Sequence, residues 1–298
     1  MNLKKLEKKD ISIISKYLND SDIKHSSYSL SNIFLWDGCL YDVMWLEYEK
    51  YLIISENPIK SNEEKRIMLP LPYNKIKPRA LCEIMNELNY DYVYYVTKDY
   101  IEKNRDEINN FFQIKENFIY SDYIYLSTDL CELKGSKYSS KRNLINQFEK
   151  NYILNTEIRK INKNSIDDII NLSKNIYHKT DKSNIEMLDC EIKAISKLKE
   201  LYDEMDFFGI TIYINNCLKG FAVGSVLSNG MCVCNFEKAD KSIKGIYQFL
   251  DREFAALVRE RFKYINKESD MGKENLKKAK LSYNPVEILD SYTLQIRK

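Results

Sequence analysis

The chain has 298 residues, a hydrophobic fraction of 44% and a formal net charge of +2. This composition is typical of a soluble globular protein with room for two domains, and it excludes disordered, fibrous and evenly basic, nucleic-acid-coating chains. No apolar run is long enough to span a bilayer and no apolar core follows the N-terminus, so the sequence predicts neither a membrane span nor a signal peptide.

The cysteines point to a reducing compartment. The chain has seven of them, an odd number, and no cluster has metal-ligand spacing. Cys232 and Cys234 alternate within an apolar run, so they share one face of a predicted strand, and no histidine lies near them. We therefore expect reduced core cysteines, no metal site and a cytoplasmic protein.

The first half is predicted to mix helices and strands. Its patterns predict helices at 11–18 and 26–36, strands at 42–48, 51–56 and 66–69, a helix at 79–88, a strand at 90–97, a polar helix, and strands within 118–126. The stretch 68–78 contains prolines and no glycine, so it lacks the N–H donors that a phosphate-binding loop needs. We expect this half to support the site or to shape a substrate cleft.

The second half repeats that order of elements. Its patterns predict a strand at 156–161, helices at 165–179 and 186–205, strands at 208–215, 218–228 and 231–238, a helix at 245–261, a strand at 263–266, a lysine-rich helix, and strands at 286–289 and 292–296. Asn215-Asn216 and Asn229-Gly230 are hairpin-turn signals. The simplest account is a duplicated α/β unit, with domains at 1–130 and 153–298 joined by a connecting helix within 131–152.

A candidate anion site lies where the strand at 231–238 leads into the next helix. Glu237 lies at the strand end, and the helix opens after Gly245, so the free main-chain N–H groups of Gly245, Ile246 and Tyr247 can bind phosphate. An ordinary strand-to-helix turn explains the same spacing. Glu237 is a candidate general base, and a simple ion pair with Lys238 or with a later lysine is the alternative.

This order of elements resembles the Gcn-type N-acetyltransferase (GNAT) fold, in which a glycine-containing loop holds the pyrophosphate of the donor. The loop KSIKGIYQ has one glycine where that fold commonly has two glycine-like positions, which counts against coenzyme A. Three motifs, LKGSKYSSKRNLINQFEKNY, FEKADKSIKGIYQFLDREF and NKESDMGKENLKKAKLSYNP, resemble the phosphatidylglycerol lysyltransferase C-terminal-like family over most of the chain. The resemblance implies an α/β chain with two tandem GNAT-like domains, each a mixed, mainly antiparallel sheet flanked by helices.

The implied fold makes two strand ends neighbours, so we expect Glu237, Glu268 and Asp270 to gather at one cleft and raise the pKa of one carboxyl. Asp270 is the alternative base. Tyr283 is a candidate proton donor for the leaving group, with a packed tyrosine as the alternative. The position that commonly carries the acid in N-acetyltransferases corresponds to Lys278, a second departure from acetyl-CoA chemistry.

Lysines supply the candidate substrate-binding residues. Lys273, Lys277 and Lys280 share one face of the lysine-rich helix, either as a solvated face or as a site for an anionic partner. In the connecting helix, Lys141 extends an apolar stripe, which suggests an interdomain pocket; a lysine whose head reaches solvent is the alternative. The remaining members of the predicted substrate-binding set are Arg142, Asn143, Lys238, Asn266 and Glu268.

The sequence therefore predicts an acyl- or aminoacyltransferase with its active cleft in the second half. The donor is aminoacyl-tRNA or acyl-CoA, no further cofactor is required, and the acceptor is an amine or hydroxyl of a small molecule or a lipid. Contact with tRNA or with a membrane surface follows from this interpretation. The rival interpretation is a catalytically inert binding module with a degenerate donor loop, and a conventional acetyl-CoA enzyme ranks third.

Overall fold

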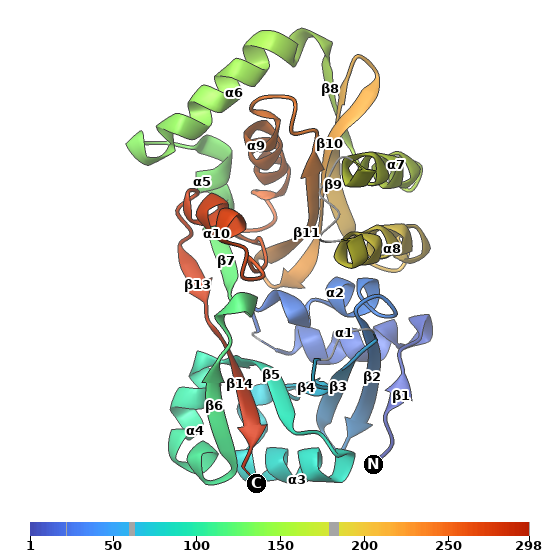
Figure 1. Ribbon diagram of the computed structural model, residues 1–298, viewed down its shortest axis with the longest axis vertical. Helices are drawn as coiled ribbons and strands as arrows, with labels where there is room; N and C mark the ends of the chain where they lie inside the picture. The colour runs from blue at the N-terminus through green and yellow to red at the C-terminus, as the bar shows by residue number, and fades with distance from the viewer. Residues whose placement is uncertain (22, 60–62, 179–184, 298) are drawn as a thin grey trace. The chain divides into compact units, whose positions relative to one another are not determined.

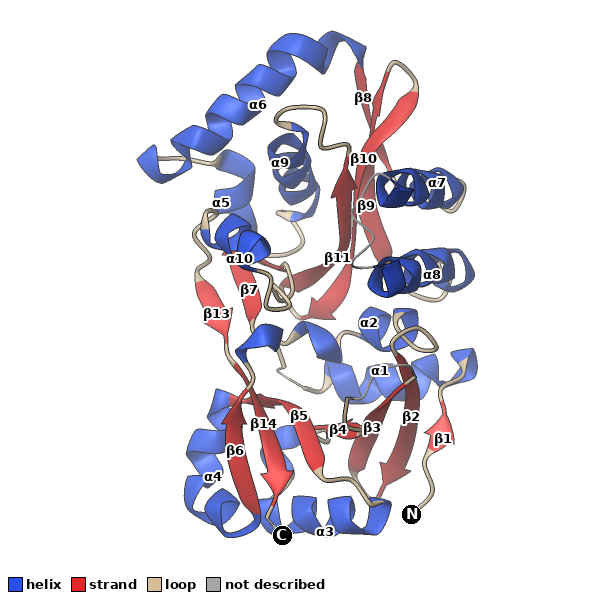
Figure 2. Cartoon of the chain, viewed as in Figure 1, coloured by secondary structure: helices blue, strands red, loops and turns tan. Residues whose placement is uncertain are grey.

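The computed structural model describes residues 1–21, 23–59, 63–178 and 185–297, with the backbone alone described at 177–178 and 185–188. The chain divides into two compact units. The first comprises Met1–Asp122, Glu268–Lys277 and Ile288–Lys298, and the second comprises Tyr123–Lys267 and Lys278–Glu287. Each is built on one seven-stranded sheet with helices packed beside it (Figures 1 and 2).

The first unit holds the sheet β1-β2-β3-β4-β5-β14-β6. Its strands are β1 (Lys4–Lys5), β2 (Tyr41–Tyr48), β3 (Tyr51–Pro58), β4 (Arg66–Met68), β5 (Tyr92–Thr97), β6 (Phe112–Glu116) and β14 (Ser291–Ile296). Its helices are α1 (Ile11–Asn19), α2 (Leu30–Leu35), α3 (Pro78–Leu88) and α4 (Lys98–Phe111), with 3₁₀ turns η1 (Lys8–Asp10), η2 (Ser26–Tyr28), η3 (Tyr73–Lys75) and η4 (Phe118–Tyr120). β4 and β5 run parallel, while the other described pairs in this sheet are antiparallel.

The second unit holds the sheet β13-β7-β12-β11-β10-β9-β8. Its strands are β7 (Asp122–Leu126), β8 (Thr156–Lys160), β9 (Phe207–Ile214), β10 (Cys217–Ser228), β11 (Met231–Ala239), β12 (Tyr264–Asn266) and β13 (Glu287–Leu289). Its helices are α5 (Ser127–Glu132), α6 (Ser139–Tyr152), α7 (Ser165–His178), α8 (Ile185–Leu201) and α9 (Ile246–Val258), with turns η5 (Ser136–Tyr138) and η6 (Ile153–Asn155). α10 (Glu274–Leu281) crosses the boundary between the units.

The hairpins of the second sheet follow from their turn residues. Asn215 and Asn216 both have positive φ, 51° and 62°, and link β9 to β10 in a two-residue turn whose twist matches that of the strands. Gly230, with φ 75°, links β10 to β11. The two hairpins predicted from these residues are confirmed. Between α9 and this sheet lies an apolar core that includes Ile246 and Leu250.

The two sheets share one topology. In each, a helix links two parallel strands: α3 lies between β4 and β5, and α9 lies between β11 and β12. In each, the next strand comes from the other half of the chain, since β14 inserts between β5 and β6 and β7 inserts between β12 and β13. The fold predicted from the order of elements, two similar mixed sheets flanked by helices, is therefore confirmed.

The boundaries of these units were not anticipated. The compact units are made of alternating segments, because the C-terminal strand joins the first sheet and a strand near residue 124 joins the second. The division into 1–130, 131–152 and 153–298 stays a prediction about parts that fold separately. The helix expected at 26–36 is interrupted, because Ser29 is extended (φ −71°, ψ 135°) between η2 and α2.

Candidate active site

The sheet of the second unit opens between its two parallel strands. β11 pairs with β12 from Met231↔Tyr264 to Val233↔Asn266, yet β11 continues to Ala239. Beyond Val233 this edge of β11 has no partner in the β12 ladder, so side chains must fill the opening. The chain places charged residues there.

Three charged side chains meet at this opening, and we call them the charge cluster: Glu237 on β11, Asp251 on α9 and Lys267 directly after β12. The Lys267 ammonium lies 2.6 Å from a Glu237 carboxylate oxygen and donates to the Asp251 carboxylate. The side chains are largely buried, with 16% of Glu237, 7% of Asp251 and 17% of Lys267 exposed. Burying charges removes them from water, and pairing offsets that desolvation cost only in part, so this geometry is held at a cost in stability.

Burial and mutual charge shift the pKa values of the cluster. Burial raises the pKa of Glu237, the negative charge of Asp251 adds to that rise, and Lys267 opposes it. Burial favours the neutral amine of Lys267, but Asp251 and Glu237 outweigh it and hold the pKa of Lys267 well above its usual value. Lys267 is therefore a lasting cation that faces the carboxyl groups of Glu237 and Asp251.

Tyr283 lies beside the cluster with an unsatisfied hydroxyl. Its side chain is buried, its ring centroid lies 5.9 Å from the Lys267 ammonium, and no described residue meets its oxygen at hydrogen-bonding geometry. Burial raises the pKa of Tyr283, and Asp251 raises it further by its charge and by its closeness to the hydroxyl, although the two groups do not meet at hydrogen-bonding geometry. A buried donor without a partner is rare in folded proteins and marks a position where a ligand group can bind.

Lys141 of α6 also lies against the Tyr283 ring. Its Nζ lies 3.9 Å from the ring centroid and donates to Ser282 Oγ at 2.6 Å. Burial lowers the pKa of Lys141; Asp251 opposes this shift and the positive charge of Lys267 adds to it. The second unit thus brings together an anionic pair, a fixed cation, a free phenol and a lysine of reduced basicity, which suit proton transfer and stabilisation of developing negative charge.

Comparison with known proteins identifies the family. Residues 19–295 match the family model described as "Phosphatidylglycerol lysyltransferase, C-terminal". The chain belongs to this family. A curated relative, uncharacterized protein MYCGA3080 of Mycoplasmoides gallisepticum, is 25% identical over 179 residues, which cover 59% of this chain and 56% of that protein. The chain thus aligns with just over half the length of that relative.

Solved structures support the fold assigned to the family. A conserved protein of unknown function from Bacteroides thetaiotaomicron matches 100% of both chains with a TM-score of 0.88 and 27% identity. The C-terminal domain of a putative lysylphosphatidylglycerol synthetase from Agrobacterium fabrum has a TM-score of 0.65 and 11% identity, over 97% of this chain and 92% of that one. A tandem GNAT protein from the clavulanic acid biosynthesis pathway has a TM-score of 0.53 and 7% identity, covering 99% and 98%. The fold is that of two tandem GNAT-like domains.

Several of the site residues predicted for this lysyltransferase-family chain lie in the same unit. Glu237, Tyr283, Lys141 and Lys280 all belong to the second unit, where Lys280 Nζ donates to the Lys267 main-chain oxygen. Sequence reasoning missed Asp251 and Lys267. Asp251 carried a signal, because it lies three residues before Phe254 on the packed face of α9, where an unpaired carboxylate would be costly.

The other two predicted carboxylates have partners in the first unit. Glu268 accepts a hydrogen bond from Asn32 Nδ2 at 2.8 Å, and buried Asp270 accepts one from the Gly272 N–H at 2.8 Å. Both lie in a turn in which Glu268 has φ 56° and Gly272 has φ 70°. Their meeting with Glu237 stays a prediction.

The Gly245 loop is shaped by helix packing. Gly245 has φ 83°, and a Cβ there would collide with the Leu144 carbonyl oxygen of α6 and lie 3.1 Å from Phe148 Cβ. Ile246 is buried in the core, and burial raises the pKa of Tyr247. An anion-binding role for these three residues stays a prediction, but close approach of α6 already explains the glycine.

Four predicted substrate-binding residues have identifiable structural surroundings. Lys238 pairs with Glu191 of α8 at 2.9 Å. Arg142 donates to the carbonyl oxygens of Leu133 and, at 2.7 Å, Gly135, so it caps the end of α5. Asn143 is exposed, and Asn266 is fully buried at the end of β12. Their predicted contact with substrate remains untested.

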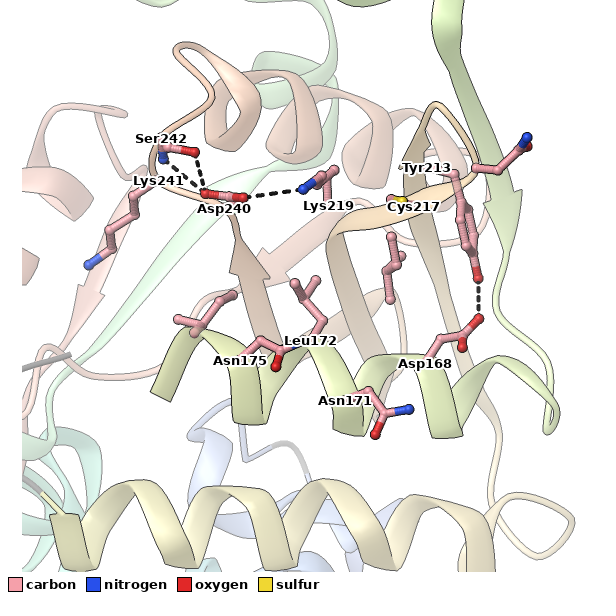
Figure 3. Close-up of a pocket in the computed structure, with 13 residues that line it drawn as sticks. Asp168, Asn171, Leu172, Asn175, Tyr213, Cys217, Lys219, Asp240, Lys241 and Ser242 are labelled. Atoms are coloured by element: carbon pink, nitrogen blue, oxygen red, sulfur yellow. Dashed lines mark hydrogen bonds and ion pairs between the residues drawn. The ribbon is translucent and has the colours of Figure 1, made fainter. Parts of the chain in front are cut away.

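A pocket of about 760 Å³, lined by apolar as well as polar side chains, forms a separate feature of the second unit, between α7, the β9–β10 hairpin and the loop after β11 (Figure 3). At one end Lys219 lies 3.5 Å from Asp240, which accepts hydrogen bonds from Ser242 (Figure 3). At the other end Tyr213 donates to Asp168 at 2.9 Å. The sequence carried no signal for this pocket, because its residues are dispersed over three segments.

Two further findings concern metal binding and membrane-spanning helices. Within the described ranges, no three histidine, cysteine or carboxylate side chains are arranged to hold a metal ion. Among the described helices, none is long and apolar enough to cross a membrane.

Proposed function

We propose that this chain is an aminoacyltransferase, which moves an aminoacyl group from an activated ester to a hydroxyl or amine acceptor in the second unit. The observation that carries the proposal is the charge cluster at the opening between β11 and β12, with the free Tyr283 hydroxyl beside it. Membership of the phosphatidylglycerol lysyltransferase C-terminal family supports acyl transfer as the reaction class.

The cluster suits the charge that develops during acyl transfer. Attack on an ester carbonyl places negative charge on the carbonyl oxygen, and pre-oriented donors at that point lower the barrier. Lys267, fixed by Glu237 and Asp251, and Tyr283, whose hydroxyl is unused, supply two such donors. Glu237, the general base expected from the sequence, has a raised pKa, but its ion pair with Lys267 opposes uptake of a proton.

The packing of α6 favours an aminoacyl ester over acyl-CoA as donor. The Leu144 carbonyl oxygen fills the space beside Gly245, at the helix start where a coenzyme A diphosphate would need N–H donors. Phe148 stacks on Phe249 with centroids 4.4 Å apart, which holds α6 against α9. An electronegative oxygen in this place disfavours a bound diphosphate.

The donor that we propose is aminoacyl-tRNA, and the acceptor is a lipid headgroup or a small molecule bearing a hydroxyl or amine. Part of the support for a tRNA donor comes from the predicted lysine face. Lys273 and Lys277 are exposed and suit phosphate contact. Lys280 does not belong to an open stripe, because it binds the Lys267 carbonyl oxygen. A peripheral contact with a membrane surface would bring a lipid acceptor to the site.

Donor binding tests this proposal. Thermal unfolding is measured with a tRNA carrying an amide-linked amino acid, with the same tRNA deacylated, and with acetyl-CoA. We expect the aminoacylated tRNA to raise Tm most, because a ligand bound only by the folded state stabilises it. Stabilisation by acetyl-CoA alone would instead support a conventional acetyltransferase. Equal stabilisation by both tRNAs, without transfer, would favour the inert binding module.

A further inference from the structure

Lys141 is a buried lysine without a counter-ion. It is 9% exposed, and its contacts in the described part of the chain are the hydrogen bond to Ser282 and the face of the Tyr283 ring, with no ion pair. Lysine is almost never so buried unless it is paired. An uncompensated ammonium here is costly, so burial shifts the protonation equilibrium of Lys141 toward the neutral amine.

The charges facing Lys141 come from the elements packed around it. Asp251 of α9 favours the ammonium, and Lys267 after β12 disfavours it; Glu237 of β11 and Lys280 of α10 bind Lys267 itself. The phenols of Tyr283 and Tyr138 both have raised pKa values and stay neutral. Burial and Lys267 outweigh Asp251, so the pKa of Lys141 is lowered.

The hydrogen-bond direction leaves the amine free to take a proton. Ser282 donates its own hydrogen to the Ala279 carbonyl oxygen at 2.5 Å, so its oxygen can only accept from Lys141. A neutral Lys141 therefore donates to Ser282 and keeps its lone pair available. Glu237 is less free, because a proton on its carboxylate would weaken the 2.6 Å ion pair with Lys267.

We propose that Lys141, and not Glu237, accepts the proton of the attacking nucleophile, an inference that rests on the proposed transfer reaction. As the acceptor oxygen or nitrogen bonds to the ester carbonyl carbon, its proton passes to Lys141 Nζ. The carbon–oxygen bond of the donor then breaks, and the Lys141 ammonium returns the same proton to the departing oxygen. No net proton is consumed. Tyr283 and Lys267 donate hydrogen bonds to the carbonyl oxygen as negative charge develops on it.

The first test measures Lys141 without any activity assay. The parent protein is labelled with an amine-specific acylating reagent over a pH series, and the extent at each lysine is read by mass spectrometry. Lys150 is the matched control, since it lies on the same helix and is exposed. We expect the labelling midpoint of Lys141 to lie below that of Lys150. Equal midpoints would overturn the proposal, whether or not the chain catalyses transfer.

The second test follows transfer against pH. Lys141→Arg keeps a cation that cannot release its proton, so turnover should fall by about 10²–10⁴-fold with donor binding retained. Lys150→Arg should match the parent, and Glu237→Gln should keep the acid limb of the parent profile. An acid limb lost in Glu237→Gln but kept in Lys141→Arg would assign the proton to Glu237 and overturn this proposal alone. Absence of transfer by the parent would overturn the proposed function as well.

Discussion

The Tyr283 hydroxyl destabilises the folded chain, because it is buried without a hydrogen-bond partner. Removing an unsatisfied buried hydroxyl relieves a desolvation cost, so Tyr283→Phe should leave Tm unchanged or raise it, while turnover falls. Tyr138→Phe is the matched control, since the Tyr138 hydroxyl donates to the Tyr283 carbonyl oxygen at 3.1 Å and its loss should cost about 1 kcal/mol. Equal destabilisation of both variants, measured by thermal unfolding, would show that Tyr283 is hydrogen-bonded after all.

Lys141 also predicts how stability depends on pH. Its pKa is lowered in the folded chain, so the unfolded chain binds more protons, and stability rises with pH up to the ordinary lysine value. Lys141→Met should flatten this rise in the pH range directly below the ordinary lysine value of about 10.4, in urea unfolding curves. The raised pKa of Lys267 acts in the opposite direction, but only at pH above the ordinary lysine value. Identical slopes in parent and variant would contradict the lowered pKa.

The residue scale also shows what the sequence could reveal about the site. Glu237 and Tyr283 could be predicted as site residues because a strand end and a helix end are visible as patterns. Lys267 was missed because nothing local separates it from the other lysines; its role comes from Asp251, 16 residues away in the chain. Long-range pairs of this kind carry no periodicity, so only the fold reveals them.

Helix packing at Gly245 makes an element-scale prediction. Gly245→Ala meets both a left-handed backbone and the α6 main chain, so it should cost about 3 kcal/mol or more in urea unfolding. Gly230→Ala is the control, because Gly230 has φ 75° but open space around it, and its cost should be about 1–2 kcal/mol. A side chain at position 245 would therefore disturb the packing of α6 as well as any donor-binding role of the loop. Equal costs at both positions would mean that α6 does not pack against the loop.

Substitutions of the lysines near and in α10 should have two different effects, on tRNA affinity or on thermal stability. Lys273→Gln with Lys277→Gln changes exposed residues and keeps good helix formers, so Tm should not change. If they contact tRNA phosphates, affinity should fall and its dependence on salt should become shallower. Lys280→Gln should instead lower Tm, because it removes the hydrogen bond to the Lys267 carbonyl oxygen. Filter binding that is unchanged at every salt concentration would leave this face without a role.

The type of each helix or strand could be predicted from the sequence more readily than the positions at which a helix is interrupted. The hairpins and α9 follow from local signals, namely paired Asn residues and an apolar stripe. The break between η2 and α2 depends on Ser29, whose hydroxyl accepts from the Asn32 N–H at 3.1 Å as a helix cap. Ser-rich stretches offer several such caps, so the sequence alone did not select this one.

At the scale of the whole molecule, strand exchange decides which fragments fold. β14 pairs with both β5 and β6, so a chain cut before Ser291 leaves the two strands without their shared partner. We expect this truncation to unfold the first unit and to leave the second largely intact, as read by amide hydrogen exchange. Protection retained in β5 and β6 would contradict it. The sequence could not predict this exchange, because strand propensity does not specify which sheet a strand joins.

The most direct test of the account is acceptor-dependent transfer of a radiolabelled amino acid from aminoacyl-tRNA, over panels of amino acids and of lipid and small-molecule acceptors. The account predicts transfer by the parent, a loss of about 10²-fold or more in Lys267→Met, and parental activity in Lys263→Met, an exposed lysine four residues away. Transfer by Lys267→Met at the parental rate, or no transfer by the folded parent from any donor to any acceptor, would contradict it.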